Sequence, residues 1–387
     1  MLDAFHDDLR AWRRLLHQNP EFGFEETETA RFVVERLKSF GITEINEGVG
    51  GTGIVASLQR GTGTGTIALR ADMDALRIPE QTNLAYASKR AGLMHACGHD
   101  GHTTMLLGAA RVLAAEGGFD GTVRFVFQPA EEWGQGMKAM LRDGLGTRFP
   151  FDEIYGLHNK PGLAVGRFET RAGAFMAAED NFEIKVRGAG GHASLPHQCR
   201  DAIVCACAIV VELQAIVARN IDPAELAVVS VTEIHSDGTR NAIASEARID
   251  GDCRNFDLGV SAAIEAAMRR IVAGVAGAHN CEAEVAYSRL FVPLINDVTA
   301  TRHALDAARA VFGADAVTPD APREGGAEDF AHALAHAPGN FANIGNGDTA
   351  VCHSPHYDFN DDALIHGVRY FVALIRHRMP EPATKPG

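Results

Sequence analysis

The first part of the chain alternates between helical spacing and short continuous apolar runs. Apolar residues three or four positions apart predict an opening amphipathic helix, whose inner face carries Leu2, Phe5, Leu9, Trp12 and Leu16. Further helices are expected over about 27–40, 102–116 and 135–142. Apolar runs predict strands over 54–58, 66–70, 122–127 and 153–157. Helices that alternate with apolar strands indicate an α/β domain around a largely buried sheet.

The pattern changes near Glu179. Phe182, Ile184 and Val186 alternate with polar residues, which predicts a strand with one exposed face. The next segments predict a helix, two strands, a helix and a strand, over 201–218, 226–234, 247–253, 261–277 and 283–288. The order β-α-β-β-α-β is typical of a ferredoxin-like unit. Because helices and one strand (341–344) follow from about Pro293, we expect two domains, a mixed-sheet domain of residues 1–178 and 292–387 and an inserted ferredoxin-like domain of residues 179–291.

Composition narrows the possible partners. The 387 residues include 36 Lys and Arg against 50 Asp and Glu, a net charge of −14, which argues against a nucleic-acid partner. The first residues, Met1–Arg14, hold three aspartates and no long apolar run, and the longest apolar stretch, Ile203–Val211, is too short to cross a bilayer. Seven cysteines without a framework spacing favour a reducing compartment. We therefore expect a cytoplasmic protein with no membrane partner.

Polar clusters follow three of the predicted strands. Arg70–Asp74 ends the strand that starts at Thr66, Gln128–Glu132 ends the next, and His158–Asn159 ends the third. Ligand sites in open α/β sheets lie outside the carboxyl ends of the strands. If these strands share one sheet, the three clusters converge on one site.

Two further clusters, His95–His102 and Cys352–His356, carry histidine and cysteine. In an extended segment Cys97 and His99 would point the same way. A set of His, Glu and one Cys suits a first-row transition metal, whereas calcium or magnesium sites would lack the Cys and most of the His. Asp72 and Asp100 are candidates to orient ligand imidazoles. Arg254 is a candidate to bind a substrate carboxylate, with a surface ion pair as the alternative.

Several strings resemble the M20 metallopeptidase family. They are Arg70–Leu76 (RADMDAL), Met94–Asp100 (MHACGHD), Phe127–Glu132 (FQPAEE), Gly190–Ser194, Glu328–Phe330 and His353–Pro355. They occur in the family's order over nearly the whole chain. The best match is the amidohydrolase branch, which includes hippurate hydrolases, N-acyl-amino-acid amidohydrolases and plant auxin-conjugate hydrolases. The strings Ala75–Pro79, Asn241–Ala244 and Gly325–Ala327 depart from the family pattern, which affects the substrate preference and not the reaction type.

The resemblance implies a site with two divalent metal ions, manganese or zinc, while cobalt or nickel would also suit the donors. The implied ligands are Cys97, His99, Glu132, His158 and His353. The residues alone do not distinguish Glu131 from Glu132, but the resemblance makes Glu131 the general base.

The resemblance also makes the inserted domain a lid that closes over the substrate and often mediates dimerisation, so a homo-oligomer is expected. In that lid, His192 would sit near the scissile carbonyl and Asn241 would touch the substrate.

The expected function is metal-dependent hydrolysis of the amide bond of a small N-acyl-amino acid. The alternatives are a dipeptidase, an N-acetyl-diaminopimelate deacetylase, or a non-catalytic metal- or ligand-binding protein on the same fold. His95, His102 and His356 have no assigned role. The string Gly48–Gly53 matches G-x-G-x-x-G, but a strand-like run follows it where a dinucleotide site needs a helix, so no nucleotide site is expected.

Overall fold

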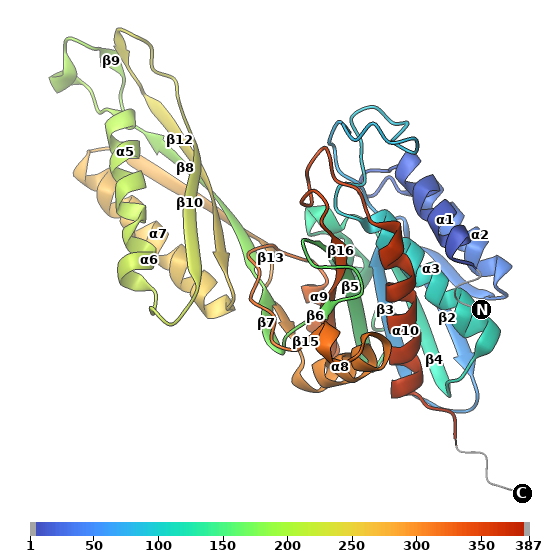
Figure 1. The fold of residues 1–387 in the computed structure, drawn as a ribbon. Coiled ribbons are helices and arrows are strands. Elements are labelled where there is room, and N and C mark those ends of the chain that lie inside the picture. Colours follow the sequence, from blue (N-terminus) through green and yellow to red (C-terminus); the bar gives the residue numbers. More distant parts are fainter. Residues whose placement is uncertain (1–4, 383–387) are drawn as a thin grey trace, which may run out of the picture. The chain divides into compact units, whose positions relative to one another are not determined.

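The computed structural model describes residues 5–382, and the chain forms two compact units (Figure 1). The larger unit consists of the chain up to Phe175, Ile295–Pro322 and the chain from Glu328. The smaller unit consists of Met176–Leu294 and Arg323–Ala327. Two domains with the smaller one inserted are therefore observed, and the short segment 323–327 joins the smaller unit although the sequence pattern did not assign it there. Leu2, expected on the opening helix, lies outside the described residues.

An eight-stranded mixed sheet forms the centre of the larger unit, in the order β1-β2-β4-β3-β5-β16-β6-β15. Its strands are β1 (Glu44–Val49), β2 (Gly53–Arg60), β3 (Thr66–Asp72), β4 (Gly121–Gln128), β5 (Glu153–Pro161), β6 (Phe168–Glu169), β15 (Val317–Thr318) and β16 (Gly339–Gly347). The four central strands β4, β3, β5 and β16 run parallel. Their carboxyl ends therefore lie along one edge of the sheet.

Both faces of the central strands are covered, which explains their continuous apolar runs. From Ile67 onward every residue of β3 is buried. Helix α3 (His99–Glu116) is buried nearly all round and packs against α1 (His6–Gln18), α2 (Thr27–Ser39) and α10 (Leu364–Arg378). The remaining helices of the unit are α4 (Gly136–Arg142), α8 (Val298–Phe312) and the short α9 (Ala331–Leu334). A helix that is apolar on all sides belongs inside a core.

The smaller unit has the expected ferredoxin-like order. Its antiparallel sheet is arranged β10-β12-β8-β13 and carries helices α5, α6 and α7. The elements are β8 (Ala178–Arg187), α5 (Ala202–Leu213), α6 (Ala215–Asn220), β10 (Ala227–Ser236), β12 (Glu246–Asn255), α7 (Leu258–Ala278) and β13 (Glu282–Phe291). Alternate residues of β8 and β12 are buried against the helices. The period of two in the sequence therefore reflects one covered face.

Three expectations about individual elements were wrong. Strand β1 was missed because Glu44–Val49 is polar and lies at the edge of the sheet. Helix α3 begins at His99 and not near residue 102. Strand β5 continues to Pro161, so His158 lies within the strand and not after its end.

Four short strands lie apart from the two main sheets and form two pairs. β9 (Gly191–His192) pairs with β11 (Ala242–Ile243), and β7 (Gly173–Met176) pairs with β14 (Leu294–Asn296). The chain crosses from one unit to the other within β7 and β14. Among the described residues, no helix has both the length and the apolar character that crossing a membrane requires.

Candidate metal centre and active site

The predicted convergence of strand ends is confirmed. Asp72 at the end of β3 lies opposite Gln128 at the end of β4 in the parallel register. On the other side, β5 pairs with β3 and brings His158 to the same edge. The polar clusters at the ends of β3 and β4 and in the last part of β5 therefore face one region.

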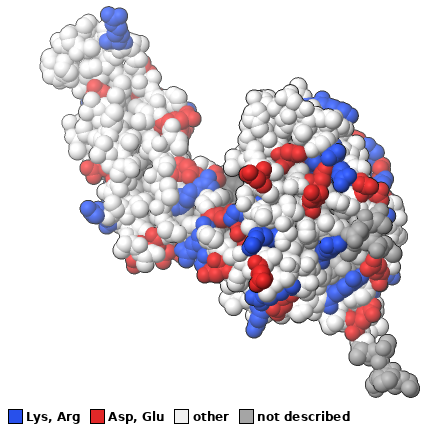
Figure 2. All heavy atoms as spheres, in the orientation of Figure 1, with Lys and Arg blue, Asp and Glu red and all other residues white. Residues whose placement is uncertain are grey.

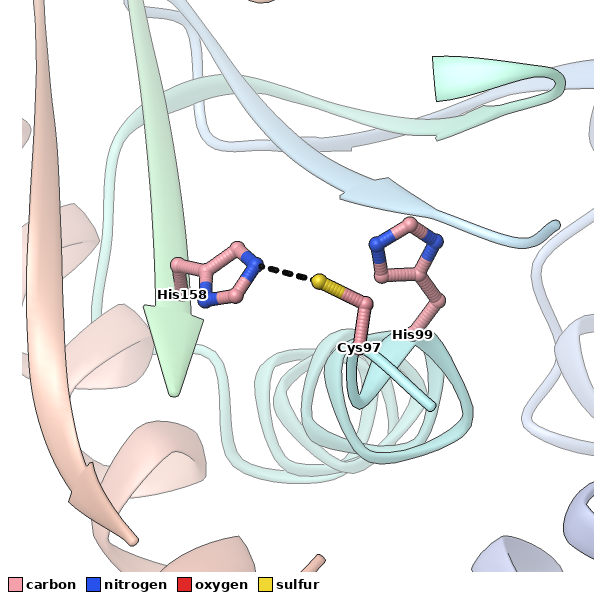
Figure 3. Close-up of side chains that lie close together, drawn as sticks. All are labelled: Cys97, His99 and His158. Atoms are coloured by element: carbon pink, nitrogen blue, oxygen red, sulfur yellow. Dashed lines mark hydrogen bonds between the residues drawn. The ribbon is translucent and has the colours of Figure 1, made fainter. Parts of the chain in front are cut away.

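Cys97, His99 and His158 form one part of this region (Figure 3). The Sγ atom of Cys97 lies 3.5 Å from Nε2 of His158, and the donor atoms of all three residues lie within 4.8 Å of one another. Cys97 and His99 do not alternate along an extended segment as expected. Gly98 adopts a left-handed conformation (φ 99°), and helix α3 starts directly after it. The turn into the helix, and not strand alternation, brings the two side chains together.

Glu132 and His353 complete the set of five candidate ligands. Nε2 of His353 lies 3.3 Å from Oε1 of Glu132, and the donor atoms of Cys97, Glu132 and His353 lie within 4.8 Å of one another. His353 has a left-handed backbone (φ 65°), and its N–H donates to the carbonyl of Ala96 at 2.7 Å. This bond fixes the C-terminal loop beside Cys97.

Hydrogen bonds at Nδ1 leave Nε2 as the nitrogen that can bind a cation in both His99 and His158. Nδ1 of His99 donates to Asp74 Oδ1 at 3.1 Å, and Nδ1 of His158 donates to the backbone carbonyl of Asn159 at 2.6 Å. In each ring the remaining Nε2 then carries the lone pair. Asp100, expected to orient a ligand, instead accepts a hydrogen bond from Nδ1 of His17 at 2.8 Å.

Two buried atoms show that a cation fits the cluster. Nε2 of His99 and Oε1 of Glu132 have no hydrogen-bond partner, and they lie 3.9 Å apart. His353 is near Glu132 Oε1 but not in hydrogen-bonding geometry. Buried polar atoms are almost always satisfied in folded proteins. A cation held between these two atoms would satisfy both, and the mixed sulfur, nitrogen and oxygen donors suit a transition metal.

The electrostatics of the cluster favour positive charge. Burial opposes the charged form of His99, but Asp72, Asp74 and Glu132 outweigh it and raise its pKa well above the usual value. The contact with Cys352 and burial raise the pKa of the Cys97 thiol. A bound cation would reverse that shift, because it stabilises the thiolate.

Glu131 sits in the turn directly before Glu132. This turn forms a short 3-10 helix, Glu131–Trp133, after β4. Burial, with the nearby carboxylates of Glu328 and Glu132, raises the pKa of Glu131 well above its usual value. Its Oε1 accepts the backbone N–H of Asp329 at 3.3 Å. A buried carboxyl group beside a cation site has the properties that a general base needs.

A buried ion cluster lies on the other side of Glu131. The guanidinium of Arg70 contacts Asp72 at 2.8 Å, Glu328 at 2.8 Å and Asp329 at 3.3 Å. Arg70 therefore connects two residues of the site. Asp72 accepts a hydrogen bond from His102, and the backbone N–H of Asp329 donates to Glu131.

The unassigned histidines have different surroundings. His102 donates from Nδ1 to Asp72 at 2.7 Å, and its Nε2 contacts Asn159, whose carbonyl holds His158. His95 is buried with no partner at either ring nitrogen. His356 is exposed and contacts the carbonyl of Gln81. Only His102 is connected to the cluster by hydrogen bonds.

The remaining predicted site residues lie in the smaller unit. His192 in β9 is the register partner of Ala242 in β11, and Asn241 accepts the N–H of Ala193 at 3.0 Å, so His192 and Asn241 are neighbours. Both are exposed, and their contact with substrate stays a prediction. The guanidinium of Arg254 pairs with Glu179 at 2.7 Å and with Asp252 at 2.9 Å. These pairs match the alternative of an ion pair and leave Arg254 a weaker candidate to bind a carboxylate.

Sequence reasoning missed the roles of Asp74, Arg70 and Asp329. Asp74 could have been found, because it stands two residues after Asp72 in the same strand-end cluster. Arg70 begins the same cluster, but its pairing with Asp329 could not be read from the sequence, since the two residues are 259 positions apart.

A parallel-centred sheet that gathers thiol, imidazole and carboxylate donors beside a buried glutamate defines a metal-dependent hydrolase. Comparison with known families makes this specific. The model of peptidase family M20/M25/M40 matches residues 68–377, and the chain belongs to this family. Within it, the chain is a member of the amidohydrolase branch, whose enzymes act on carbon–nitrogen bonds.

Individual relatives agree over almost the full length. Hippurate hydrolase of Campylobacter jejuni is 38% identical over 362 residues, which covers 94% of each chain. N-acetylcysteine deacetylase of Bacillus subtilis is 38% identical over 372 residues, 96% of this chain and 97% of the relative. The crystal structure of Bacillus subtilis YXEP, a dinuclear metal-binding peptidase of the M20 family, superposes with a TM-score of 0.85 at 34% identity, over 97% of this chain and 99% of the other.

Proposed function

We propose that this enzyme hydrolyses the amide bond of N-acylated amino acids, with Glu131 as the general base. The observation that carries the proposal is the buried Glu131 beside five convergent candidate ligands. Two relatives support the substrate class, because hippurate and N-acetylcysteine are both N-acyl amino acids. Their acyl groups differ, so the relatives favour the class over any single acyl group.

For the cofactor we propose two divalent transition-metal ions, manganese or zinc, with cobalt or nickel as further fits to the donor set. Bound there, they would polarise the amide carbonyl and lower the pKa of water. The proposed ligands are Cys97, His99, Glu132, His158 and His353.

In this proposal Glu131 moves the proton. The N–H of Asp329 holds Oε1, so we assign proton transfer to Oε2. Glu131 accepts a proton from the attacking water and then delivers it to the leaving amine nitrogen. Burial favours the protonated form that this second step requires.

A substrate panel tests the reaction. It contains N-benzoylglycine, several N-acetyl amino acids, dipeptides and N-acetyl-diaminopimelate, each assayed with and without a chelator. We expect chelator-sensitive hydrolysis of the benzoyl or acetyl amino acids. Cleavage of dipeptides or N-acetyl-diaminopimelate alone would favour the alternative enzymes. No hydrolysis by a metal-loaded protein would favour a binding protein.

A pair of variants tests the roles of the adjacent glutamates. Glu131→Gln should lower kcat by about 10²–10⁴-fold while metal content is unchanged. Glu132→Gln should lose bound metal, and inductively coupled plasma mass spectrometry measures the metal content of both variants. Wild-type turnover in Glu131→Gln contradicts the proposed mechanism.

We also propose that the enzyme forms a homo-oligomer through the smaller unit. Ile203, Val204, Cys207 and Val211 project from one side of α5 and are exposed. Strand β10 is an edge of its sheet and exposes Val228 and Ile234. Figure 2 shows few charged side chains where this unit carries α5. An apolar patch beside an unpaired strand edge suits a second copy of the chain.

The proposed location is the cytoplasm. The thiol of Cys97 must stay reduced to bind a metal ion, which a reducing compartment favours.

A further inference from the structure

The side chain of Glu26 is buried, and its hydrogen-bond partners are distant in sequence. Glu26 directly precedes α2 and has no exposed surface, and its carboxylate does not cap that helix. Instead Oε1 accepts the backbone N–H of Ala130 at 2.8 Å, and Oε2 accepts the hydroxyl of Thr52 at 2.5 Å. A glutamate from the N-terminal segment is thus bonded to the residue before Glu131.

Ala130 is the residue where the chain turns from β4 into the short helix that carries Glu131 and Glu132. Its backbone is left-handed (φ 47°), which is uncommon for a residue with a Cβ atom. Its carbonyl accepts the N–H of Gly136 at 3.1 Å. The backbone of Gly23 packs closely against Ala130, because a Cβ atom added at Gly23 would lie 3.0 Å from the Cβ of Ala130. A strained residue of this kind persists only when its surroundings hold it.

Besides the Gly136 bond within the turn, three bonds hold it to distant parts of the chain, and each comes from a different segment. Glu26 holds the N–H of Ala130, Asp74 accepts the N–H of Glu132 at 3.1 Å, and the N–H of Asp329 holds the carboxylate of Glu131. Of these, only the Glu26 bond acts on the left-handed residue itself. Losing it would leave a buried N–H without a partner and release the turn.

We propose that Glu26 is a positioning residue that sets the orientation of Glu131 and Glu132 through the Ala130 N–H. The inference rests on the proposed function of those two glutamates. Glu26 itself touches no candidate ligand in the described contacts.

The state of the carboxyl group supports a dedicated role. Burial, with a smaller contribution from the charge of Asp74, outweighs the Thr52 hydrogen bond and raises the pKa of Glu26 to about 7. A buried carboxyl group with a raised pKa is unfavourable for stability in neutral solution. Such groups cluster at functional sites.

Two variants of similar volume separate the hydrogen bond from packing. Glu26→Gln keeps an oxygen for the Ala130 N–H and can donate its amide to Thr52. Glu26→Met fills the space without an acceptor. Glu25→Met is the matched control, because Glu25 is the exposed neighbour. Each protein is assayed for kcat and KM on the best N-acyl amino acid, and for Zn²⁺ affinity by competition with a chromophoric chelator.

We expect Glu26→Met to lower kcat by about 10–100-fold, with KM changed far less, and to weaken Zn²⁺ binding in the same direction. Glu26→Gln should recover most of both losses, and Glu25→Met should match the wild type. Equal values for Glu26→Met and Glu25→Met overturn the proposal, as does a Gln variant no better than Met.

Two further results, a Glu26→Met variant that does not fold and a wild type without the proposed activity, still allow the role of Glu26 to be tested. If Glu26→Met does not fold, Thr52→Val, which removes the hydroxyl donor to Oε2, should lower kcat less but in the same direction. A folded Thr52→Val with wild-type kcat and Zn²⁺ affinity then overturns the proposal. If the wild type hydrolyses no N-acyl amino acid, the proposed function fails, while the Zn²⁺ affinities of the variants still decide the role of Glu26.

Discussion

Asp74 and His99 form a carboxylate–imidazole pair at the candidate metal centre, with Nδ1 of His99 3.1 Å from Oδ1 of Asp74. The second oxygen of Asp74 accepts the N–H of Glu132 at 3.1 Å. One carboxylate therefore orients two candidate ligands that come from different segments of the chain.

Asp74→Asn should weaken Zn²⁺ binding by about 10–100-fold, because an amide cannot accept from both donors at once. Competition titration against a chelator measures this affinity. Asp100→Asn is the control, since Asp100 adjoins His99 in sequence but bonds to His17. An equal loss of affinity in both variants would contradict the assignment.

His17 should make the stability of the larger unit depend on pH. Burial opposes its charge, but hydrogen bonds to Asp100 and Glu80 outweigh burial and raise the pKa of His17 to about 9. Because the pKa of His17 is higher in the folded than in the unfolded protein, protonated His17 stabilises the fold. This stabilisation is complete below a pH of about 6.5 and is lost as the pH rises through about 9. The loss should be on the order of 2–3 kcal/mol. Urea unfolding at both ends of this range measures it.

The variant His17→Gln should remove most of that pH dependence. His197→Gln, at an exposed position, should retain it. If the unfolding free energy of the wild type does not change over this pH range, Asp100 and Glu80 do not stabilise protonated His17, and the prediction is wrong.

Arg70→Met should destabilise the protein strongly. The guanidinium is buried among Asp72, Glu328 and Asp329, so its removal leaves buried carboxylates without a counter-charge. Breaking a buried ion cluster in this way costs about 3–5 kcal/mol. The free energy of unfolding in urea measures the effect. Arg187→Met, which breaks an exposed pair with Glu284, should leave stability nearly unchanged, and similar losses in the two variants would refute the prediction.

Val211→Glu should convert the proposed oligomer into a monomer, because it places a charge within the apolar face of α5. Size-exclusion chromatography with light scattering measures the mass. Val298→Glu is a close control, since Val211 and Val298 are each 68% exposed but Val298 lies on α8 of the larger unit. The proposed interface is wrong if Val211→Glu leaves the mass unchanged.

The central architecture was predictable because burial leaves a direct trace in sequence. Strand β3 is covered on both faces and appears as a continuous apolar run, while β8 is covered on one face and alternates. Strands β6 and β15 have two residues each, too few for any pattern to emerge. Edge strand β1 has half-exposed polar residues and resembles a loop.

The candidate ligands were easier to predict than the residues that orient them. Cys97, Glu132 and His353 have side chains whose chemistry by itself suggests metal binding. Asp74 and Asp100 are the same residue type, and Asp100 is adjacent to His99 in sequence whereas Asp74 lies 25 positions away, yet the path of the chain into α3 brings Asp74 to His99 and Asp100 to His17. Glu26 lies 104 positions from Ala130, so no local pattern could connect them.

The order of strands in the large sheet has a consequence for synthesis on the ribosome. Strand β16 lies between β5 and β6 but emerges only after the whole smaller unit. At about 5–20 residues per second, β5 waits roughly ten to thirty seconds with an unpaired apolar edge. The inserted unit completes its own sheet during that interval. The nascent chain is then most prone to aggregation, and chaperone demand should peak before residue 339 is made.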